Sequence, residues 1–187
     1  KEAKKYNNFC WLDMENSTYT DRTFEIYNGC KREYEGVGVA IQSYLHRSRN
    51  DMETMSRNGF SARICKGIYV EDKSIAFKGR QAIKENYLDL AKTLEAQGGY
   101  AAYATHDHGL IDRLLEWIEY DNIDPNRFEF QTLYGVPMDG RLEKLLDKGY
   151  KVRIYVPFGP DWFDYSLRRL GENPDIVGYV IKNMITN

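Results

Sequence analysis

The sequence predicts a parallel α/β fold, because short apolar runs alternate with charge-rich amphipathic stretches along the whole chain. Each run has the length of a strand and the nearly continuous apolar character of a strand buried on both faces. The predicted strands are Phe9–Met14, Val37–Gln42, Ala62–Ile68, Tyr100–Thr105, Phe128–Leu133 and Lys151–Val156. No low-complexity linker divides the chain, so we expect a single domain over residues 1–187.

Two of the stretches between strands carry a clear helical pattern. Residues 82–96 place their apolar side chains on one stripe, and Gly98 and Gly99 follow as signals for a helix end. In the later stretch, apolar residues recur at helical spacing and charged residues occupy the other faces. These apolar residues are Leu110, Ile111, Leu114, Leu115 and Ile118.

Polar residues near the carboxyl ends of the predicted strands favour a (βα)8 barrel of TIM type over an open doubly wound sheet. In a barrel all strand ends meet at one mouth, whereas an open sheet brings together only those at its switch point. These residues are Asp13, Glu15, Gln42, Lys66, Tyr69, His106, Gln131 and Tyr155. No GxGxxG motif follows a predicted strand, so a Rossmann site lacks support. Because six units are too few to close a barrel, we expect that about two N-terminal units are missing from this sequence.

Charge and cysteine content argue against several classes of function. With 26 Lys and Arg against 28 Asp and Glu, the formal net charge is −2, and no basic stretch offers a nucleic-acid site. Three cysteines without a CxxC pair argue against a disulfide framework and a structural zinc site, and favour a reducing, cytoplasmic compartment. No apolar run approaches the ~18 residues of a membrane-spanning helix, so any membrane contact would be peripheral. Nothing in the sequence favours one oligomeric state.

Arg168 and Arg169 form the sharpest local feature of the sequence. Two guanidinium groups near a barrel mouth can converge on one carboxylate, which implies a small acid as ligand. The alternative is a solvated basic patch in which Glu172 pairs with either arginine at helical spacing. The residues alone leave both interpretations open.

Arg63 and Lys66 place two cations on a strand that should otherwise be buried. Because a buried unpaired cation is costly, we expect an anion or an electron-rich ligand beside them. Lys66 also fits the position of a Schiff-base lysine, as found at strand ends of barrel aldolases.

Two pairs of side chains near strand ends could contact a ligand. His106 and His108 have the spacing of two metal ligands on one strand face, but no third ligand is evident, so we expect no metal. Gln42 and Gln131 either satisfy neighbouring backbone groups or contact a heterocycle with ring nitrogens and carbonyls, such as a flavin.

Five ordered segments resemble proline dehydrogenases over essentially the whole chain. They are Gln42–Tyr44, Arg63–Tyr69, Ala104–Asp107, Phe128–Gly135 and Tyr155–Leu170. The similarity is to short bacterial monofunctional enzymes and to the same domain of bifunctional PutA proteins. It implies a distorted barrel that binds FAD and oxidises L-proline to 1-pyrroline-5-carboxylate by hydride transfer to flavin N5. It also implies a membrane quinone as electron acceptor, with peripheral association at the inner face of the membrane.

The resemblance further implies a role for each matching residue. Arg168 and Arg169 would hold the proline carboxylate, with Glu172 paired to them. Arg63 would lie beside flavin N5. The residues that would shape the proline pocket and its polar network are Tyr155, Ile64, Tyr69 and Asp13. The remaining flavin contacts would come from Gln42, Gln131, Lys66, Gly67, Thr105 and His106.

The chain departs from the family pattern in two respects. The family usually has Leu-Val where this chain has Ile64 and Cys65, and Ala in place of Ile68. No segment corresponds to the first barrel strand, which carries a lysine in the proline site. An aldolase that uses Lys66 and a catalytically silent barrel that serves as an assembly partner are therefore the two alternatives.

Overall fold

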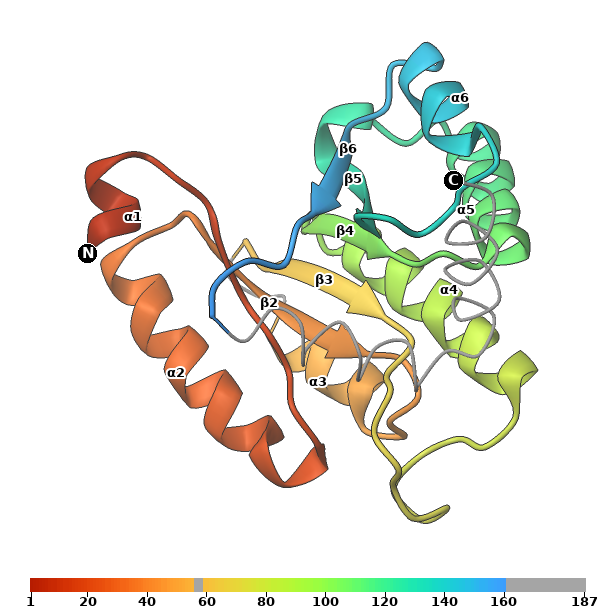
Figure 1. Ribbon diagram of the computed structural model, residues 1–187. Helices are drawn as coiled ribbons and strands as arrows, with labels where there is room; N and C mark the ends of the chain where they lie inside the picture. Colours follow the sequence, from red (N-terminus) through yellow and green to blue (C-terminus); the bar gives the residue numbers. More distant parts are fainter. Residues whose placement is uncertain (56–58, 161–187) are drawn as a thin grey trace.

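In the computed structural model, which describes residues 1–55 and 59–160, six parallel strands form one curled sheet (Figure 1). The strands are β1 (Cys10–Leu12), β2 (Val37–Gln42), β3 (Ser61–Cys65), β4 (Tyr100–Ala104), β5 (Phe128–Leu133) and β6 (Val152–Tyr155). Their order in the sheet is their order in the chain. The predicted parallel α/β fold is confirmed, with a sheet that has the shape of a half-barrel. Closure into an eight-stranded barrel remains a prediction.

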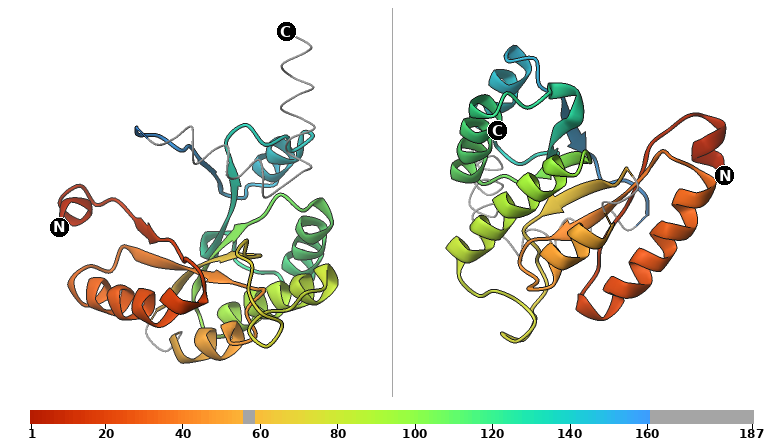
Figure 2. Two further views of the ribbon diagram at one scale, coloured as in Figure 1. Left: turned by 60° about the horizontal axis from the view of Figure 1, so that its bottom comes forward. Right: turned by 180° about the vertical axis from the view of Figure 1, so that it is seen from behind.

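Helices join the successive strands and cover one face of the sheet (Figure 2). They are α2 (Thr20–Glu33), α3 (Ser48–Met55), α4 (Arg80–Ala96), α5 (His108–Tyr120) and α6 (Arg141–Asp147), with 3-10 turns η1 (Ser17–Tyr19) and η3 (Pro125–Arg127), whereas the short α1 (Glu2–Lys5) precedes β1 and buries no residue. Both helices with a clear pattern in the sequence are confirmed as α4 and α5. Within the described ranges, no helix combines the length and the apolar character needed to cross a membrane.

The main core lies between the outer face of the sheet and these helices. Alternate strand residues, such as Val39, Ile64 and Phe130, are almost completely buried there. They pack with Leu90 of α4 and Leu114 of α5, which have no exposed surface. Because strand side chains alternate between faces, the residues between them point to the opposite, inner face.

The inner face, which the helices do not cover, carries small and polar side chains. Its central members are Ala40, Gln42, Arg63, Cys65, Ala102, Ala104, Glu129, Gln131 and Arg153. In the strand register, Arg63 lies beside Ala40 on one neighbouring strand and Ala102 on the other. These two alanines leave room for the long Arg63 side chain to reach across β4.

Candidate functional site

Arg63 lies at the centre of a hydrogen-bond network on the inner face. Its Nε–H donates to Oε1 of Gln131 on β5 at 2.9 Å, and a terminal N–H donates to the carboxylate of Asp13, just after β1. The guanidinium carbon lies 5.3 Å from the centre of the Trp11 ring, a cation–π distance. These contacts from β1 and β5 hold an arginine whose side chain is only 18% exposed.

Glu129 continues the network toward β6. Its carboxylate accepts from Nε2 of Gln131 at 2.5 Å and from Arg153 at 2.7 and 2.9 Å, a bidentate pair. The hydroxyl of Tyr100 donates to it at 3.2 Å. Burial alone would raise the pKa of Glu129, but the hydrogen bonds from Arg153 and Gln131 outweigh burial and lower it. We call this set, namely Asp13, Arg63, Gln131, Glu129, Arg153 and Tyr100, the Arg63 network.

Hydrogen bonds connect the loop after β1 to the end of β2 and to the loop after β3, at the mouth of the half-barrel. Nε2 of Gln42 donates to the backbone carbonyl of Glu15 at 2.7 Å, and the Tyr69 hydroxyl donates to the Glu15 carboxylate. Ser17 donates through its backbone N–H and its hydroxyl to Glu71, at 2.7 and 2.8 Å. Gln42 therefore satisfies a backbone group through its Nε2, while its contact with a heterocycle remains a prediction.

Asp107 joins β3, α4 and α5 in a second polar cluster. Lys66 donates to its carboxylate at 2.5 Å and Lys84 at 3.0 Å, and the backbone N–H of Leu110 donates at 3.1 Å, so Asp107 caps α5. Thr105 accepts from the backbone N–H of Asp107 at 3.1 Å. Burial raises the pKa of Asp107, but the hydrogen bonds from both lysines outweigh it and hold the pKa well below its usual range.

This low pKa predicts a pH-dependent loss of stability in the variant Asp107→Asn. Asparagine also caps helices, so the substitution removes mainly the charge. The folded-state pKa lies below the unfolded value of about 3.9, so the charged group stabilises the fold above that value and loses its effect as the pH falls. We expect the variant to lose about 1–2 kcal/mol of unfolding free energy at pH 7, and this deficit to shrink as the pH falls below the unfolded pKa and to vanish only as the pH reaches the much lower folded pKa.

Urea unfolding at several pH values measures this difference. A deficit of the same size at pH 7 and at pH 3 would contradict the role of the Asp107 charge. Asp107→Ala serves as comparison, because it also removes the helix cap and should lose about 1 kcal/mol more at every pH.

His106 and His108 lie on different elements. Nε2 of His106 accepts from the backbone N–H of Leu133 at 2.9 Å, so the ring is neutral with its proton on Nδ1. Burial, and then the charge of Lys66, lower the pKa of His106. β4 ends at Ala104, before His106, and His108 is the first residue of α5. The two rings therefore do not lie on one face of a strand, in contrast to the spacing-based expectation. In the part of the chain that the structure describes, no group of three metal-ligating side chains occurs.

The remaining predicted residues are placed as follows. Gly67 lies against the ring of Tyr44 with a φ of +97°. Tyr155 ends β6 and is 43% exposed. Ile64 is fully buried in the helix-facing core, opposite Arg63, so the structure does not bring it to the inner face. The sites of Arg168, Arg169 and Glu172 lie outside the described residues.

Comparison with known proteins agrees with this arrangement. The sequence profile described as proline dehydrogenase matches residues 1–181. The chain belongs to the proline dehydrogenase family. Proline dehydrogenase 1 of Bacillus subtilis subsp. natto is 36% identical over 183 residues, which cover 98% of this chain and 60% of that protein. The proline dehydrogenase of Deinococcus radiodurans is 36% identical over 186 residues, with the same two shares. The chain thus spans about 60% of the length of these curated relatives.

Solved structures of PutA proteins share the fold. PutA from Bdellovibrio bacteriovorus, inactivated by N-propargylglycine, superposes with a TM-score of 0.80 at 25% identity, over 90% of this chain and 20% of that one. PutA from Corynebacterium freiburgense gives a TM-score of 0.76 at 16% identity, over 92% and 21% of the two chains, a likeness of fold alone. In this chain, the half-barrel that resembles these structures carries the Arg63 network on its inner face.

Several residues of the site escaped the sequence analysis as site residues, among them Asp107, Glu129 and Arg153. Asp107 stands directly before an amphipathic stretch, which is the signal of a helix cap. Glu129 interrupts the apolar run of β5, and a charge inside a buried strand implies a partner. The identity of that partner, Arg153, depends on the pairing register of β5 and β6.

Proposed function

We propose that this protein carries out the FAD-dependent oxidation of L-proline to 1-pyrroline-5-carboxylate, the first step of proline catabolism. The observation that carries the proposal is Arg63, held rigidly on the inner face of a proline dehydrogenase fold. Arginine has five N–H groups, and hydrogen bonds within the described part of the chain use two of them. The others are available to an electron-rich ring.

The donor set of the inner face fits a flavin. Small residues, among them Ala40, Ala102 and Ala104, form a floor from which Arg63 projects. FAD, when bound, supplies the acceptor for the hydride, while the protein supplies placement and charge. Arg63 would place a fixed positive charge beside the flavin ring, where negative charge develops as the ring accepts the hydride. Such a preorganised charge lowers the activation barrier of hydride transfer, because the site need not rearrange during the reaction.

The remaining contacts belong to the same proposal. Lys66, Gly67, Thr105 and His106, at the ends of β3 and β4, hold the rest of FAD, and Gln42 and Gln131 flank its ring. Arg168 and Arg169, with Glu172, bind the proline carboxylate, because paired guanidinium groups suit a bidentate anion.

The substrate side lies over the ends of β1, β3 and β6. Tyr69 and Tyr155 border the proline, and Asp13 belongs to the polar network beside it. The amine proton leaves to solvent or to the surroundings of Asp13 and Tyr155. Electrons leave to a quinone, at the inner face of the membrane, where the protein associates peripherally.

The contacts of Lys66 speak against the aldolase alternative. A Schiff base needs a neutral amine as nucleophile, whereas Lys66 donates to the Asp107 carboxylate at 2.5 Å. Borohydride trapping of a substrate adduct on Lys66 would favour the aldolase.

We expect the purified protein, with FAD supplied, to show a flavin absorption spectrum that bleaches when L-proline is added without an electron acceptor. Bleaching reports cofactor, substrate and hydride transfer together. D-proline, which has the opposite configuration at Cα and so directs its carboxylate differently, serves as control and should leave the spectrum unchanged. A protein that stays colourless after addition of FAD would refute the proposal and favour the catalytically silent barrel.

A further inference from the structure

We propose that Glu129 is a positioning residue, which fixes the side-chain amide of Gln131 and thereby the direction of Arg63. The inference rests on the proposed function, since the direction of Arg63 matters for chemistry only if a flavin lies beside it. Glu129 need not touch the substrate or the cofactor for this role.

The amide of Gln131 has a single orientation because its two neighbours have opposite hydrogen-bonding character. Arg63 carries only donors, so Oε1 of Gln131 must face it, at 2.9 Å from Nε. An ionised carboxylate only accepts, so Nε2 of Gln131 must face Glu129, at 2.5 Å. Each neighbour enforces the same orientation of the amide.

Glu129 is itself fixed by its surroundings. Its side chain is only 4% exposed and receives hydrogen bonds from Arg153, Gln131 and Tyr100. Arg153 balances its charge through a bidentate pair, and Asp13 pairs with Arg63 at the other end of the network. Glu129 therefore acts on Arg63 chiefly through the orientation of Gln131 and less through its own charge.

The substitution Glu129→Gln removes this constraint while it keeps the shape of the side chain. A glutamine at 129 can turn its NH2 group toward Gln131, which then turns its own NH2 group toward Arg63. Two donors would face each other, and the Arg63 Nε–H would lose its acceptor.

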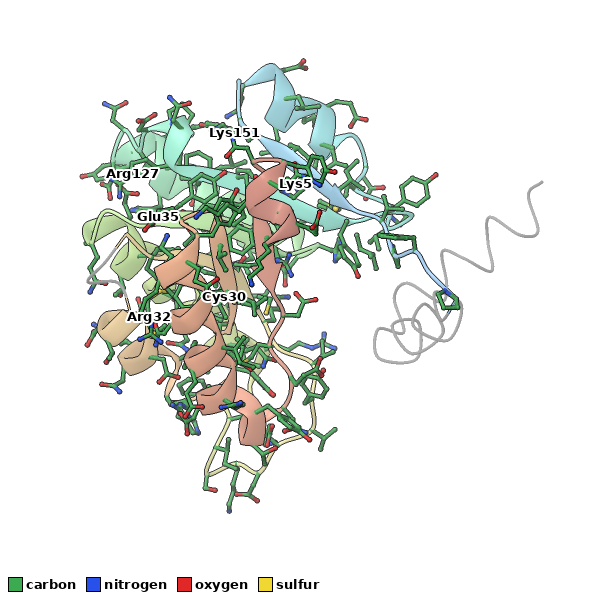
Figure 3. All side chains as sticks on the ribbon, turned by 90° about the vertical axis from the view of Figure 1, so that its left-hand side faces the viewer. Lys5, Cys30, Arg32, Glu35, Arg127 and Lys151 are labelled. Carbon is green, nitrogen blue, oxygen red and sulfur yellow. The ribbon has the colours of Figure 1, made fainter. Side chains whose placement is uncertain are left out.

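A matched control pair lies at the other end of the sheet. Arg127 (Figure 3), directly before β5, donates to the carboxylate of Glu95 at 2.6 Å, and the Glu95 side chain is 18% exposed. The pair joins the end of α4 to the start of β5, and within the described ranges the side-chain hydrogen bonds of Arg127 go to Glu95 and Gly99 and to no member of the Arg63 network. Glu95→Gln therefore perturbs a similar acid–arginine pair without affecting Gln131.

The first experiment measures hydrogen exchange of the Arg63 Nε–H by NMR in the full chain without FAD, with Arg63→Lys used to assign the signal. We expect exchange about tenfold faster in Glu129→Gln, as for loss of one charge-assisted hydrogen-bond partner, and no change in Glu95→Gln. Gln131→Met, which removes the amide but leaves Glu129 and Arg153 paired, should accelerate exchange equally. If Glu129→Gln fails to fold, Glu129→Asp replaces it, because the shorter side chain keeps the charge but withdraws the carboxylate from Nε2 of Gln131, and it should accelerate exchange in the same way. Unchanged exchange in the folded variants would overturn the proposal.

The second experiment measures flavin reduction by L-proline in the FAD-loaded protein. We expect Glu129→Gln to reduce flavin about tenfold more slowly at saturating proline, with the FAD dissociation constant unchanged. In the Gln131→Met background, Glu129→Gln should have no further effect, because its effect passes through Gln131. Additive effects, or a normal rate despite faster exchange, would overturn the positioning role. If the parent protein binds no FAD, the proposed function fails, while the exchange data still decide whether Glu129 directs Arg63.

Discussion

Arg63→Gln is expected to slow the reduction of flavin by L-proline by about a hundredfold to a thousandfold, as loss of a preorganised donor does in other active sites. Glutamine carries no charge and is too short to reach both Gln131 and Asp13. The fold should survive the substitution, because Asp13 is 64% exposed and water can solvate it once its partner is gone. Stopped-flow absorbance of the flavin, at saturating proline, measures the rate.

Arg113→Gln is the control for this prediction. Arg113 on α5 makes a bidentate pair with Glu85 on α4, at 2.9 and 2.8 Å, on the helical side of the molecule. Its loss should leave flavin reduction unchanged. Equal rates in Arg63→Gln and the parent protein would show that Arg63 has no part in hydride transfer.

Gly67→Ala is expected to destabilise the protein by about 2–4 kcal/mol and to weaken FAD binding with it. A Cβ atom at Gly67 would lie 2.2 Å from Cδ1 of Tyr44, far inside contact distance. Tyr44 cannot yield easily, because it is 5% exposed and its backbone N–H donates to the Lys66 carbonyl at 2.9 Å. The strain would therefore displace Lys66, one of the proposed FAD contacts.

Gly135→Ala separates the contact with Tyr44 from backbone strain. Gly135 also has a positive φ, +83°, but a Cβ atom there would have no neighbour within 4 Å. It should lose only about 1–2 kcal/mol, the penalty of a left-handed backbone for alanine. Urea unfolding of both variants gives the comparison, and equal losses would rule out the contact with Tyr44 as the cause.

The sequence predicted the strands well where apolar runs end at a clear break. β2 and β5 have their predicted bounds, and the other strands overlap theirs. β3 ends at Cys65 and not at Ile68, because Gly67 takes up a φ of +97° and turns the chain out of the extended conformation. Ile68 extends the apolar run in the sequence, yet it is 43% exposed in the loop that follows.

The site was harder to predict than the strands, because its contacts depend on strand register. Strand ends alone indicated that Asp13 and Gln131 lie at one mouth, and Arg63, expected only to have a partner because it is a cation on a buried strand, donates to both of them. Ile64 is adjacent to Arg63 on β3, so the alternation of strand side chains places it on the opposite, helix-facing side of the sheet. The resemblance to the family, which was transferred position by position, assigned Ile64 to the proline pocket without regard to this alternation. The pairing of Glu129 with Arg153 needs the observed register, since a slip of one residue would exchange the two faces of the strand.

The order of the strands has a consequence for how the protein folds. Among the six described strands, each pairs with its neighbours in the chain, so this sheet can grow one unit at a time as the polypeptide leaves the ribosome. The Arg63 network forms later than the strand pairs. The two hydrogen bonds from Arg63 join residues 50 and 68 positions apart in the sequence, and each crosses a neighbouring strand, β2 or β4. The Nε–H of Arg63 therefore has its acceptor, Gln131, only after β5 has joined the sheet. The Arg63 network is therefore completed late in folding, and it can form only when the preceding strands are paired in the correct register.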